Sequence, residues 1–569
     1  MTAGRWRVLV RSLMSASDEK RWPTLNVTNG RSAVANAGRS HFARGLGAGA
    51  ALLILATAAC VTTSRAGSSN WESSFVPGHD ASYVRSPCPD PNYQPPGPVP
   101  TPNPYVQLNL PAGTVCGVLT VPENRSHPNG RKITIGVAEV KALSPHPPPD
   151  PIVYLTGGPG GSAFLSANSL IKAGINRDRN VIFVDQRGEY HSDPALTCPE
   201  IDNFAVQQAG LSVLAPTTES KDLSAVTNCH DRLTKEGYDL SAYNTPENAA
   251  DIADLRAEMG IKDWNVYGVS YGSDLALQML RLFPQGIRSV VLDSVVPPQL
   301  NVVDQWWPAA AEAFKALFAA CAAEPACNQA YPNLTQDLTT AVNRLAAHPL
   351  TVQVPQSAGA AQSVVLDGYS LANLVIVASL SGDYADLPEA IHNAATGNGI
   401  PAAELLVQQV AGTPPGLEAW GLLFGVFCSE EVGYTSPAAE LAAAKKALPD
   451  FPELVLRLVP QLARIFSECG VWNVKRATPS TPAPTHSKVP ALLLTGSLDA
   501  ATPPSWAYQA AKTLTHSTVV TLRGLGHDTL LHSSCAASIL NAFVTEPTES
   551  VDTGCTKSLT SPTFMTASG

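Results

Sequence analysis

The hydrophobic pattern of this chain predicts a parallel β-sheet with helices between its strands. Two apolar runs, residues 152–155 and 181–184, carry no charged residue, as is typical of strands buried on both faces. Residues 246–259 have helical apolar spacing and end before Gly260, so they predict a helix. The alternation of strands and helices indicates a parallel sheet with crossover connections. Further strands are predicted at 116–121, 132–140, 264–267, 288–292, 491–494 and 518–522, and further helices at 273–283, 505–514 and 529–543.

This alternation is interrupted between residues 297 and 487. The interrupting stretch is rich in Ala and Leu at helical spacing, and we interpret it as an inserted helical cap. The fold class is therefore α/β, with residues 105–296 as the first part of the core and 488–569 as its C-terminal part. Residues 60–104 are rich in Pro and Ser and predict an extended tether.

The N-terminus has the pattern of an export signal. Two arginines precede a short apolar run, 46–59, that ends in small residues before Cys60. The run is too short to span a bilayer, so we interpret residues 1–59 as a signal peptide rather than as a buried helix. Thr57-Ala58-Ala59-Cys60 resembles a bacterial lipoprotein box, which implies acylation of Cys60 and attachment to a membrane. Ordinary cleavage into a free secreted protein is the alternative, and either outcome predicts an exported protein.

The cysteine count supports this interpretation. The chain has eleven cysteines, so lipidation of Cys60 leaves an even number that an oxidising compartment could pair. No C-x-x-C pair is present, and no metal site is expected. Pairing of neighbours along the chain would join Cys88 to Cys116, Cys198 to Cys229, Cys321 to Cys327, Cys428 to Cys469 and Cys535 to Cys555.

Composition narrows the classes of function. Hydrophobic residues make up 44% of the chain and charged residues 15%, so a sizeable core can form. The net charge is −10, and no basic cluster occurs after the signal-like segment. A nucleic acid is therefore not an expected partner, because phosphate binding needs a basic surface.

A G-x-S-x-G box identifies a candidate nucleophile. Gly268-Val269-Ser270-Tyr271-Gly272 follows a predicted strand and precedes a predicted helix, which is the context of a nucleophile elbow. The sharp turn exposes the serine oxygen and leaves room only for glycines on either side. Ser270 is therefore the expected nucleophile, rather than part of a Gly-rich turn without chemistry.

A serine nucleophile needs a base and an acid that orients the base. In α/β-hydrolases the chain order is Ser, acid, His. Asp499 and His527 each follow a predicted strand, at the edge where a parallel sheet presents its ligands, and they are the expected acid and base. Asp293, after the strand that precedes the cap, is the rival acid, and Asp528 is interpreted as a helix cap.

A Gly-rich loop after the strand at 152–155 is the expected oxyanion loop. Residues 156–161, T-G-G-P-G-G, lack the G-K-[ST] of a phosphate-binding loop. A tetrahedral intermediate needs two backbone N–H donors, and we expect them from Gly158 and Tyr271. Residues 185–188, D-Q-R-G, are expected to contain a structural ion pair that supports this loop.

Together, T-G-G-P-G, D-Q-R-G, G-V-S-Y-G, G-S-L-D-A-A-T-P-P and G-x-G-H resemble the proline iminopeptidase and tripeptidyl aminopeptidase group of α/β-hydrolases, over residues 105–560. The resemblance implies an α/β-hydrolase fold with a helical cap over the catalytic residues. Thr156 replaces the first residue of the group's usual H-G-G-P-G, which leaves the backbone donors intact. Glu189 and Tyr190 replace the group's usual small residues after D-Q-R-G and are expected at the pocket rim.

The resemblance also suggests how a substrate is held. Cys428-Ser429-Glu430-Glu431 in the cap resembles the group's C-x-E element. An exopeptidase of this kind needs an acidic group for the substrate's free amine, so Glu430 and Glu431 are candidate amine anchors. A solvated acidic pair is the alternative.

The resulting expectation is an exported serine aminopeptidase that releases short N-terminal peptides through an acyl-enzyme, without a cofactor. A carboxylesterase or lipase with the same triad is the first alternative, because specificity resides in the cap. A binding lipoprotein that has lost catalysis is the second. The expected substrate is a peptide or an ester.

Overall fold

The computed structural model describes residues 71–95, 107–356, 361–412 and 416–566. These residues belong to one compact unit, Ser68–Gly569. The expected signal peptide, residues 1–59, and the expected lipidation site Cys60 lie outside the described residues.

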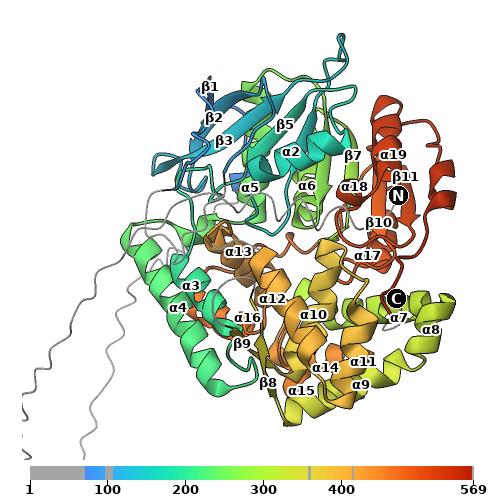
Figure 1. The fold of residues 1–569 in the computed structure, drawn as a ribbon. Coiled ribbons are helices and arrows are strands. Elements are labelled where there is room, and N and C mark those ends of the chain that lie inside the picture. The colour runs from blue at the N-terminus through green and yellow to red at the C-terminus, as the bar shows by residue number, and fades with distance from the viewer. Residues whose placement is uncertain (1–70, 96–106, 357–360, 413–415, 567–569) are drawn as a thin grey trace, which may run out of the picture. The chain divides into compact units, whose positions relative to one another are not determined.

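A nine-stranded sheet lies in the upper half of this unit as drawn in Figure 1. Its strand order is β1-β2-β3-β5-β4-β6-β7-β10-β11. The pairs β1–β2, β2–β3 and β3–β5 are antiparallel, and all neighbours from β5 to β11 are parallel. This mostly parallel sheet with helices on both faces is the α/β-hydrolase fold, which confirms the expected fold class. The strands are β1 (Ser82–Arg85), β2 (Val115–Pro122), β3 (Lys132–Val140), β4 (Ile152–Leu155), β5 (Val181–Asp185), β6 (Trp264–Val269), β7 (Ile287–Asp293), β10 (Ala491–Gly496) and β11 (Ser517–Leu522).

Helices cover both faces of the sheet because successive strand residues point to opposite sides. In β4, Val153 and Leu155 pack in the hydrophobic cluster of α5, α6 and α17, whereas Ile152 and Tyr154 pack in the cluster of α2 and α19. All four side chains are buried, which explains the uninterrupted apolar run in this strand. The helices are α2 (Ala163–Ala173), α5 (Thr245–Glu258), α6 (Tyr271–Leu282), α17 (Pro504–Ala511), α18 (Thr529–His532) and α19 (Ser534–Thr545).

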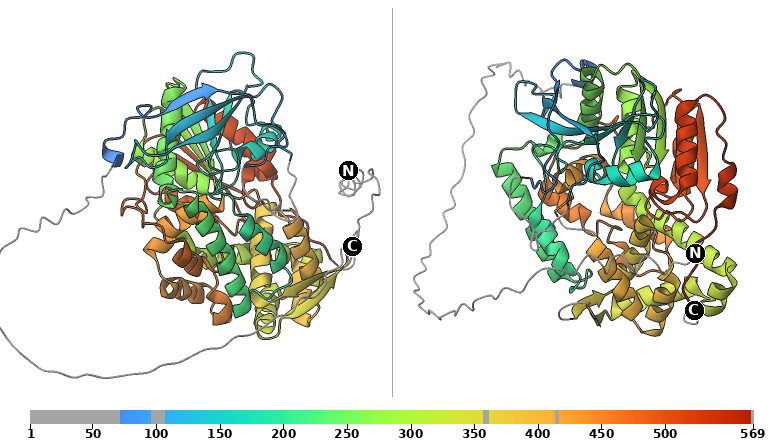
Figure 2. Two further views of the ribbon diagram at one scale, coloured as in Figure 1. Left: turned by 90° about the vertical axis from the view of Figure 1, so that its left-hand side faces the viewer. Right: turned by 45° about the horizontal axis from the view of Figure 1, so that its top comes forward.

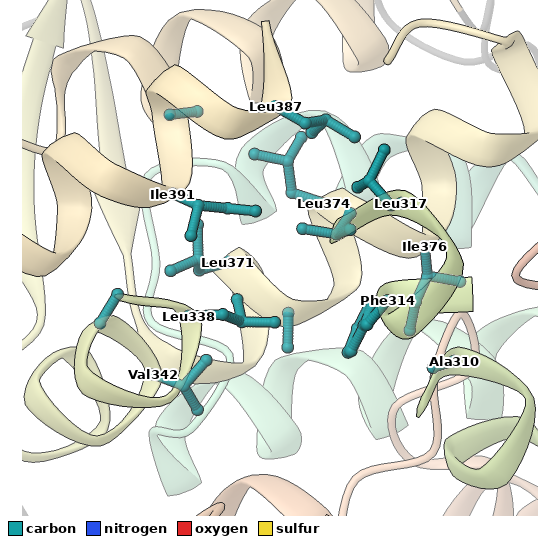
Figure 3. Packing of buried hydrophobic residues seen from close by; sticks show 14 of the residues in the cluster. Ala310, Phe314, Leu317, Leu338, Val342, Leu371, Leu374, Ile376, Leu387 and Ile391 are labelled. Atoms are coloured by element: carbon teal, nitrogen blue, oxygen red, sulfur yellow. The ribbon is translucent and has the colours of Figure 1, made fainter. Parts of the chain in front are cut away.

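The elements between β7 and β10, which we call the cap, gather at one end of the sheet and have a hydrophobic core of their own (Figure 2). The cap also contains a two-stranded antiparallel sheet, β8 with β9, that the sequence pattern did not predict. Figure 3 shows side chains that converge from four cap helices: Ala310, Phe314 and Leu317 of α7, Leu338 and Val342 of α9, Leu371, Leu374 and Ile376 of α10, and Leu387 and Ile391 of α11. The cap elements are α7 (Val302–Ala323), α8 (Pro325–Ala330), α9 (Leu334–Ala347), β8 (Leu350–Val354), β9 (Gln362–Leu366), α10 (Gly368–Ser381), α11 (Leu387–Thr396), α12 (Ile400–Gly412), α13 (Trp420–Val426), the π-helical turn η4 (Phe427–Glu431), η5 (Val432–Tyr434), α14 (Pro437–Ala447), α15 (Glu453–Leu456) and α16 (Ile465–Trp472).

Two segments outside the cap sequence have unexpected positions. Helices α3 (Pro199–Gln208) and α4 (Pro216–Lys235) precede the cap along the chain but pack with it, since Phe204 shares a cluster with Phe424 and Trp472, and α4 lies beside α16 (Figure 1). Within the segment expected to be a tether, β1 forms the edge strand of the large sheet. β1 is short and its side chains are largely exposed, so no apolar run marks it in the sequence.

The disulfides follow the neighbour pairing expected from the sequence. Every cysteine in the described residues is bonded. The five bonds are Cys88–Cys116, Cys198–Cys229, Cys321–Cys327, Cys428–Cys469 and Cys535–Cys555. Within the described ranges, no helix combines the length and the hydropathy that crossing a membrane requires.

Candidate active site

Ser270 lies on a sharp turn between β6 and α6. Its φ of 56° and ψ of −125° are values that residues other than glycine rarely adopt. A β-carbon at Gly268 would lie 2.1 Å from the carbonyl oxygen of Gly272, and one at Gly272 would lie 2.0 Å from that of Leu155. The box therefore needs its two glycines, because backbone fills the space on both sides of the turn.

His527 and Asp499 come together although 28 residues separate them. His527 Nδ1 lies 2.9 Å from Asp499 Oδ2. The two residues follow β11 and β10, which are parallel neighbours, so both side chains emerge at the same edge of the sheet. The N–H groups of Ala501 and Thr502 donate to Asp499 Oδ1 at 2.9 Å, and Thr502 Oγ1 donates to Oδ2 at 2.7 Å. These bonds fix the carboxylate toward the imidazole.

Burial disfavours the ionised forms of Asp499 and His527, whereas the attraction between their opposite charges favours them. Burial alone would raise the pKa of Asp499, but the charge of His527 and hydrogen bonds from His527 and Thr502 hold that pKa below its ordinary value. Burial alone would lower the pKa of His527, but the charge and hydrogen bond of Asp499 raise it above its ordinary value. With Nδ1 engaged by Asp499, Nε2 is the nitrogen left for proton transfer.

The carboxylate of Asp293, the rival acid, is hydrogen-bonded to the N-terminus of α18. It accepts hydrogen bonds from the N–H groups of Thr529 and Leu530, each at 3.2 Å, and from Thr529 Oγ1 at 2.9 Å. Tyr267 Oη donates to it at 3.2 Å. Asp528 occupies the N-cap position of α18, as expected, but its side chain makes no close capping hydrogen bond. Asp293, at the end of β7, supplies the side-chain hydrogen bonds at this helix end.

The Gly-rich loop after β4 lies against the elbow. Gly158 and Tyr271 both border the cavity at Ser270. Tyr271 is the first residue of α6, so its N–H has no partner within the helix. Gln186 Nε2 donates to the carbonyl oxygen of Thr156 at 3.0 Å and thereby supports the loop from behind.

Asp185 and Arg187 do not form the ion pair expected of D-Q-R-G. Asp185 accepts hydrogen bonds from Ser162 Oγ at 2.8 Å and from the N–H of Phe164 at 3.0 Å, at the start of α2. Arg187 is fully buried, and its guanidinium binds the carboxylate of Asp251 in α5 at 2.7 and 2.8 Å. The two side chains point to helices on opposite faces of the sheet, which keeps them apart.

Glu189 and Tyr190, expected at the pocket rim, pack within the loop after β5. Glu189 is fully buried, and its Oε2 accepts a hydrogen bond from the N–H of Gln186 at 2.7 Å. Tyr190 packs edge-on against Tyr93 and His191. Both side chains therefore serve the packing of this loop.

A cavity of about 380 Å³ extends from Ser270 and His527 to the cap. Its wall combines apolar side chains with acidic ones. The core contributes the loop 156–161, Tyr271, Asp274 and Trp506, and the cap contributes Val302, Trp306, Glu418, Phe427 and Glu431.

The two candidate amine anchors occupy different positions. Glu431 lines the cavity, and its Oε2 accepts a hydrogen bond from the N–H of Val302 at 2.7 Å. Glu430 is buried, and its Oε1 accepts a hydrogen bond from the N–H of Thr245 at 2.7 Å. Burial raises the pKa of Glu430 to about 8. Of the two, Glu431 is the one that borders the cavity.

Sequence reasoning did not mention Asp274 and Glu418, and it assigned Asp528 only as a helix cap, although all three acids border the cavity. Asp274 follows Ser270 by four residues, which puts it on the same side of α6, one turn further on. Its Oδ1 is buried without a hydrogen-bond partner in the described part of the chain, and burial raises its pKa to about 7. Glu418, in the cap segment before α13, borders the cavity at the Gly-rich loop. The spacing from Ser270 could have identified Asp274, whereas no local pattern marks Glu418.

One group of three potential metal ligands occurs among the described residues. It consists of Cys198, Glu200 and Cys229. The two cysteines form a disulfide, so this group offers no thiolate to a metal ion.

Parts of this chain are similar in sequence to known proteins. Residues 459–555 match the family model of TAP-like proteins. Tripeptidyl aminopeptidase from Streptomyces coelicolor is 29% identical over 212 residues, which cover 35% of this chain and 38% of that protein. Serine protease Hip1 from Mycobacterium tuberculosis is 26% identical over 208 residues, which cover 35% of this chain and 39% of that protein. The matched region thus spans less than two fifths of the length of these relatives.

Among solved structures, proline iminopeptidase from Mycobacterium smegmatis aligns with 75% of this chain and 98% of its own, at 14% identity and a TM-score of 0.36. The family match and the two curated relatives together confirm the resemblance that the sequence motifs indicated.

Proposed function

Since this chain is an α/β-hydrolase whose C-terminal region is that of the TAP-like proteins, we propose that it is a serine peptidase with Ser270 as nucleophile, His527 as base and Asp499 as acid. The observation that carries the proposal is the 2.9 Å contact of His527 Nδ1 with the buried carboxylate of Asp499, beside the cavity that Ser270 borders. A protein that only binds ligands has no need of this arrangement, which argues against the inactive lipoprotein.

The chemistry follows from these roles. His527 Nε2 takes the proton of Ser270 while the serine oxygen attacks the substrate's carbonyl carbon. The N–H groups of Gly158 and Tyr271 stabilise the negative charge on the carbonyl oxygen. His527 then gives its proton to the departing amine nitrogen, and the peptide bond breaks. Water, activated by the same imidazole, hydrolyses the resulting ester and restores Ser270.

The acidic wall of the cavity supports an aminopeptidase that releases short N-terminal peptides. Glu431 and Asp274 both border the cavity, and burial raises the pKa of each carboxyl group. A substrate ammonium group there would favour their ionised forms and gain charge-assisted hydrogen bonds. Glu430, the other candidate anchor, is buried behind the cavity wall, and its carboxyl group accepts a hydrogen bond from the N–H of Thr245. A carboxylesterase is the second candidate function, since Val302, Trp306 and Phe427 form an apolar wall that suits an uncharged acyl group.

The proposal includes export. Five disulfides in one chain are typical of proteins that fold in an oxidising compartment, and the signal-like run precedes Cys60. Acylated Cys60 would attach the enzyme to a membrane of the cell envelope. Mass spectrometry of the mature protein should show a lipid-modified Cys60 at its N-terminus. A mature N-terminus beyond Cys60 would contradict the lipid anchor and leave a secreted enzyme.

A fluorophosphonate probe tests the nucleophile, because only an activated serine attacks phosphorus at neutral pH. The probe should label the wild type and an exposed-site control, Ser505→Ala, and should not label Ser270→Ala. Equal labelling of Ser270→Ala would exclude this nucleophile. A panel of free-amine tripeptidyl amides, their N-acetylated forms and simple esters then separates aminopeptidase from esterase.

A further inference from the structure

Glu418 lies directly on the oxyanion loop. A β-carbon added to Gly160 would come 2.7 Å from Glu418 Oε1, and one added to Gly158 would come 3.3 Å from the same oxygen. The next residue, Ala419, donates its N–H to the carbonyl oxygen of Gly160 at 3.0 Å, so the cap segment is fixed to the loop. Glu418 also borders the cavity that contains Ser270.

One oxygen of the Glu418 carboxyl group, Oε1, is buried and has no hydrogen-bond partner in the described part of the chain. A buried polar atom without a partner is costly, and native structures contain few of them outside functional sites. The group is thus available to a molecule that enters the cavity.

The surroundings of Glu418 favour the neutral form of its carboxyl group. Burial raises the pKa of Glu418 to about 8, and the charge of Asp202 in α3 adds to the effect. Glu189, after β5, is a further acid close enough to interact with it. Trp420 Nε1 donates to Asp202 Oδ1 at 3.0 Å rather than to Glu418. The remaining acids of the cavity wall are Asp274, Glu431 and Asp528, and its base is His527.

We infer that the protonated carboxyl group of Glu418 donates a hydrogen bond to the substrate's acyl oxygen, as a third donor beside the N–H groups of Gly158 and Tyr271. The inference rests on the proposed serine-hydrolase mechanism but not on the class of substrate. In its ionised form, the same group would repel the negative charge that develops on that oxygen. Only the neutral form therefore supports catalysis.

The test is the pH dependence of kcat/KM for p-nitrophenyl acetate, whose charge does not change with pH. We expect kcat/KM of the wild type to fall as pH rises through about 8, where Glu418 ionises. Glu418→Gln keeps an N–H donor at every pH, so its kcat/KM should persist to higher pH. Glu418→Ala removes the donor and should lose about 10²-fold at all pH values, as removal of one oxyanion donor does.

Glu440→Gln is the matched control. Burial raises the pKa of Glu440 to about 8 as well, but this residue lies in α14, away from the cavity. The kcat/KM of Glu440→Gln should fall at alkaline pH as that of the wild type does. The inference is overturned if kcat/KM of Glu418→Gln falls at the same pH as that of the wild type, or if its kcat/KM is as low as that of Glu418→Ala. Because Gln has nearly the size of Glu, this variant tests the inference even if Glu418→Ala does not fold.

The same assays separate this inference from the proposed function. Turnover of the ester without turnover of any free-amine peptide would contradict the proposed aminopeptidase activity. The pH profiles of the Glu418 variants would still test the inference. Absence of both ester turnover and fluorophosphonate labelling in the wild type would overturn both.

Discussion

Gly157 lies so close to Ser270 that a β-carbon on the glycine would come within 2.8 Å of the serine's own β-carbon and 3.4 Å of its Oγ. The oxyanion loop and the nucleophile elbow therefore touch through backbone and β-carbon atoms. Any side chain at position 157 must push one of them away.

This contact predicts that Gly157→Ala lowers the rate at which a fluorophosphonate labels Ser270. A displacement of about 1 Å in an active site can cost roughly 10²-fold in rate. Gly470→Ala is the control, because a β-carbon there meets nothing within 4 Å. Labelling of Gly157→Ala at the wild-type rate would mean that the loop can move without consequence for the serine.

Asp499→Asn should lower kcat by about 10⁴-fold, because an amide no longer holds the imidazole in the productive tautomer. It should also shift the acid limb of the pH–rate profile. The base must be neutral, so activity is lost as pH falls through the pKa of His527. The charge of Asp499 raises that pKa, so its removal should move the acid limb to lower pH.

Asp293→Asn is the matched control for this prediction. Asp293 accepts hydrogen bonds from the N-terminus of α18 and does not hydrogen-bond to His527, so its variant should mainly lower the melting temperature. If Asp293→Asn produces the large loss of kcat and Asp499→Asn does not, the acid has been assigned to the wrong strand.

Replacing Glu431 or Asp274 by its amide should weaken binding of a free amine only. A hydrogen bond to a charged group contributes about 1.5–3 kcal/mol, so Glu431→Gln or Asp274→Asn should cost roughly ten- to a hundredfold in kcat/KM for free-amine peptides. N-acetylated peptides and esters carry no ammonium group and should be nearly unaffected.

Glu430→Gln separates anchoring from packing. Its carboxylate is engaged by Thr245, so this variant should depress all substrates alike or lower stability. Cleavage of acetylated peptides as fast as free ones by the wild type would contradict the aminopeptidase and favour an esterase or endopeptidase.

The Cys428–Cys469 disulfide should contribute more to stability than the Cys321–Cys327 disulfide. The cysteines of the first bond are 41 residues apart in the sequence, and those of the second are 6 residues apart. The loop-entropy relation then gives contributions of about 4 and about 2 kcal/mol, respectively. Thermal unfolding of the two double Cys→Ser variants measures the difference. A larger loss for the short loop would show that strain or packing outweighs loop entropy here.

The sequence alone was sufficient for features that depend on neighbouring residues. Apolar runs marked β4 and β5 because both faces of these strands are buried. The elbow around Ser270 could be identified because its G-x-S-x-G box is contiguous in the chain, although the contacts that require Gly272 come from β4. Neighbour pairing identified the disulfides, since chain segments that are close in sequence are joined at little cost in loop entropy.

Only the tertiary structure decided between side chains that compete for one position. Asp293 and Asp499 both end strands at the same edge of the sheet, and α18 engages Asp293, which leaves Asp499 for His527. The strand β1 needed its partner β2 to exist, because its own side chains are largely exposed. Glu418 reaches the oxyanion loop from 258 residues after Gly160 in the chain, and no local pattern encodes a contact between segments so distant in sequence.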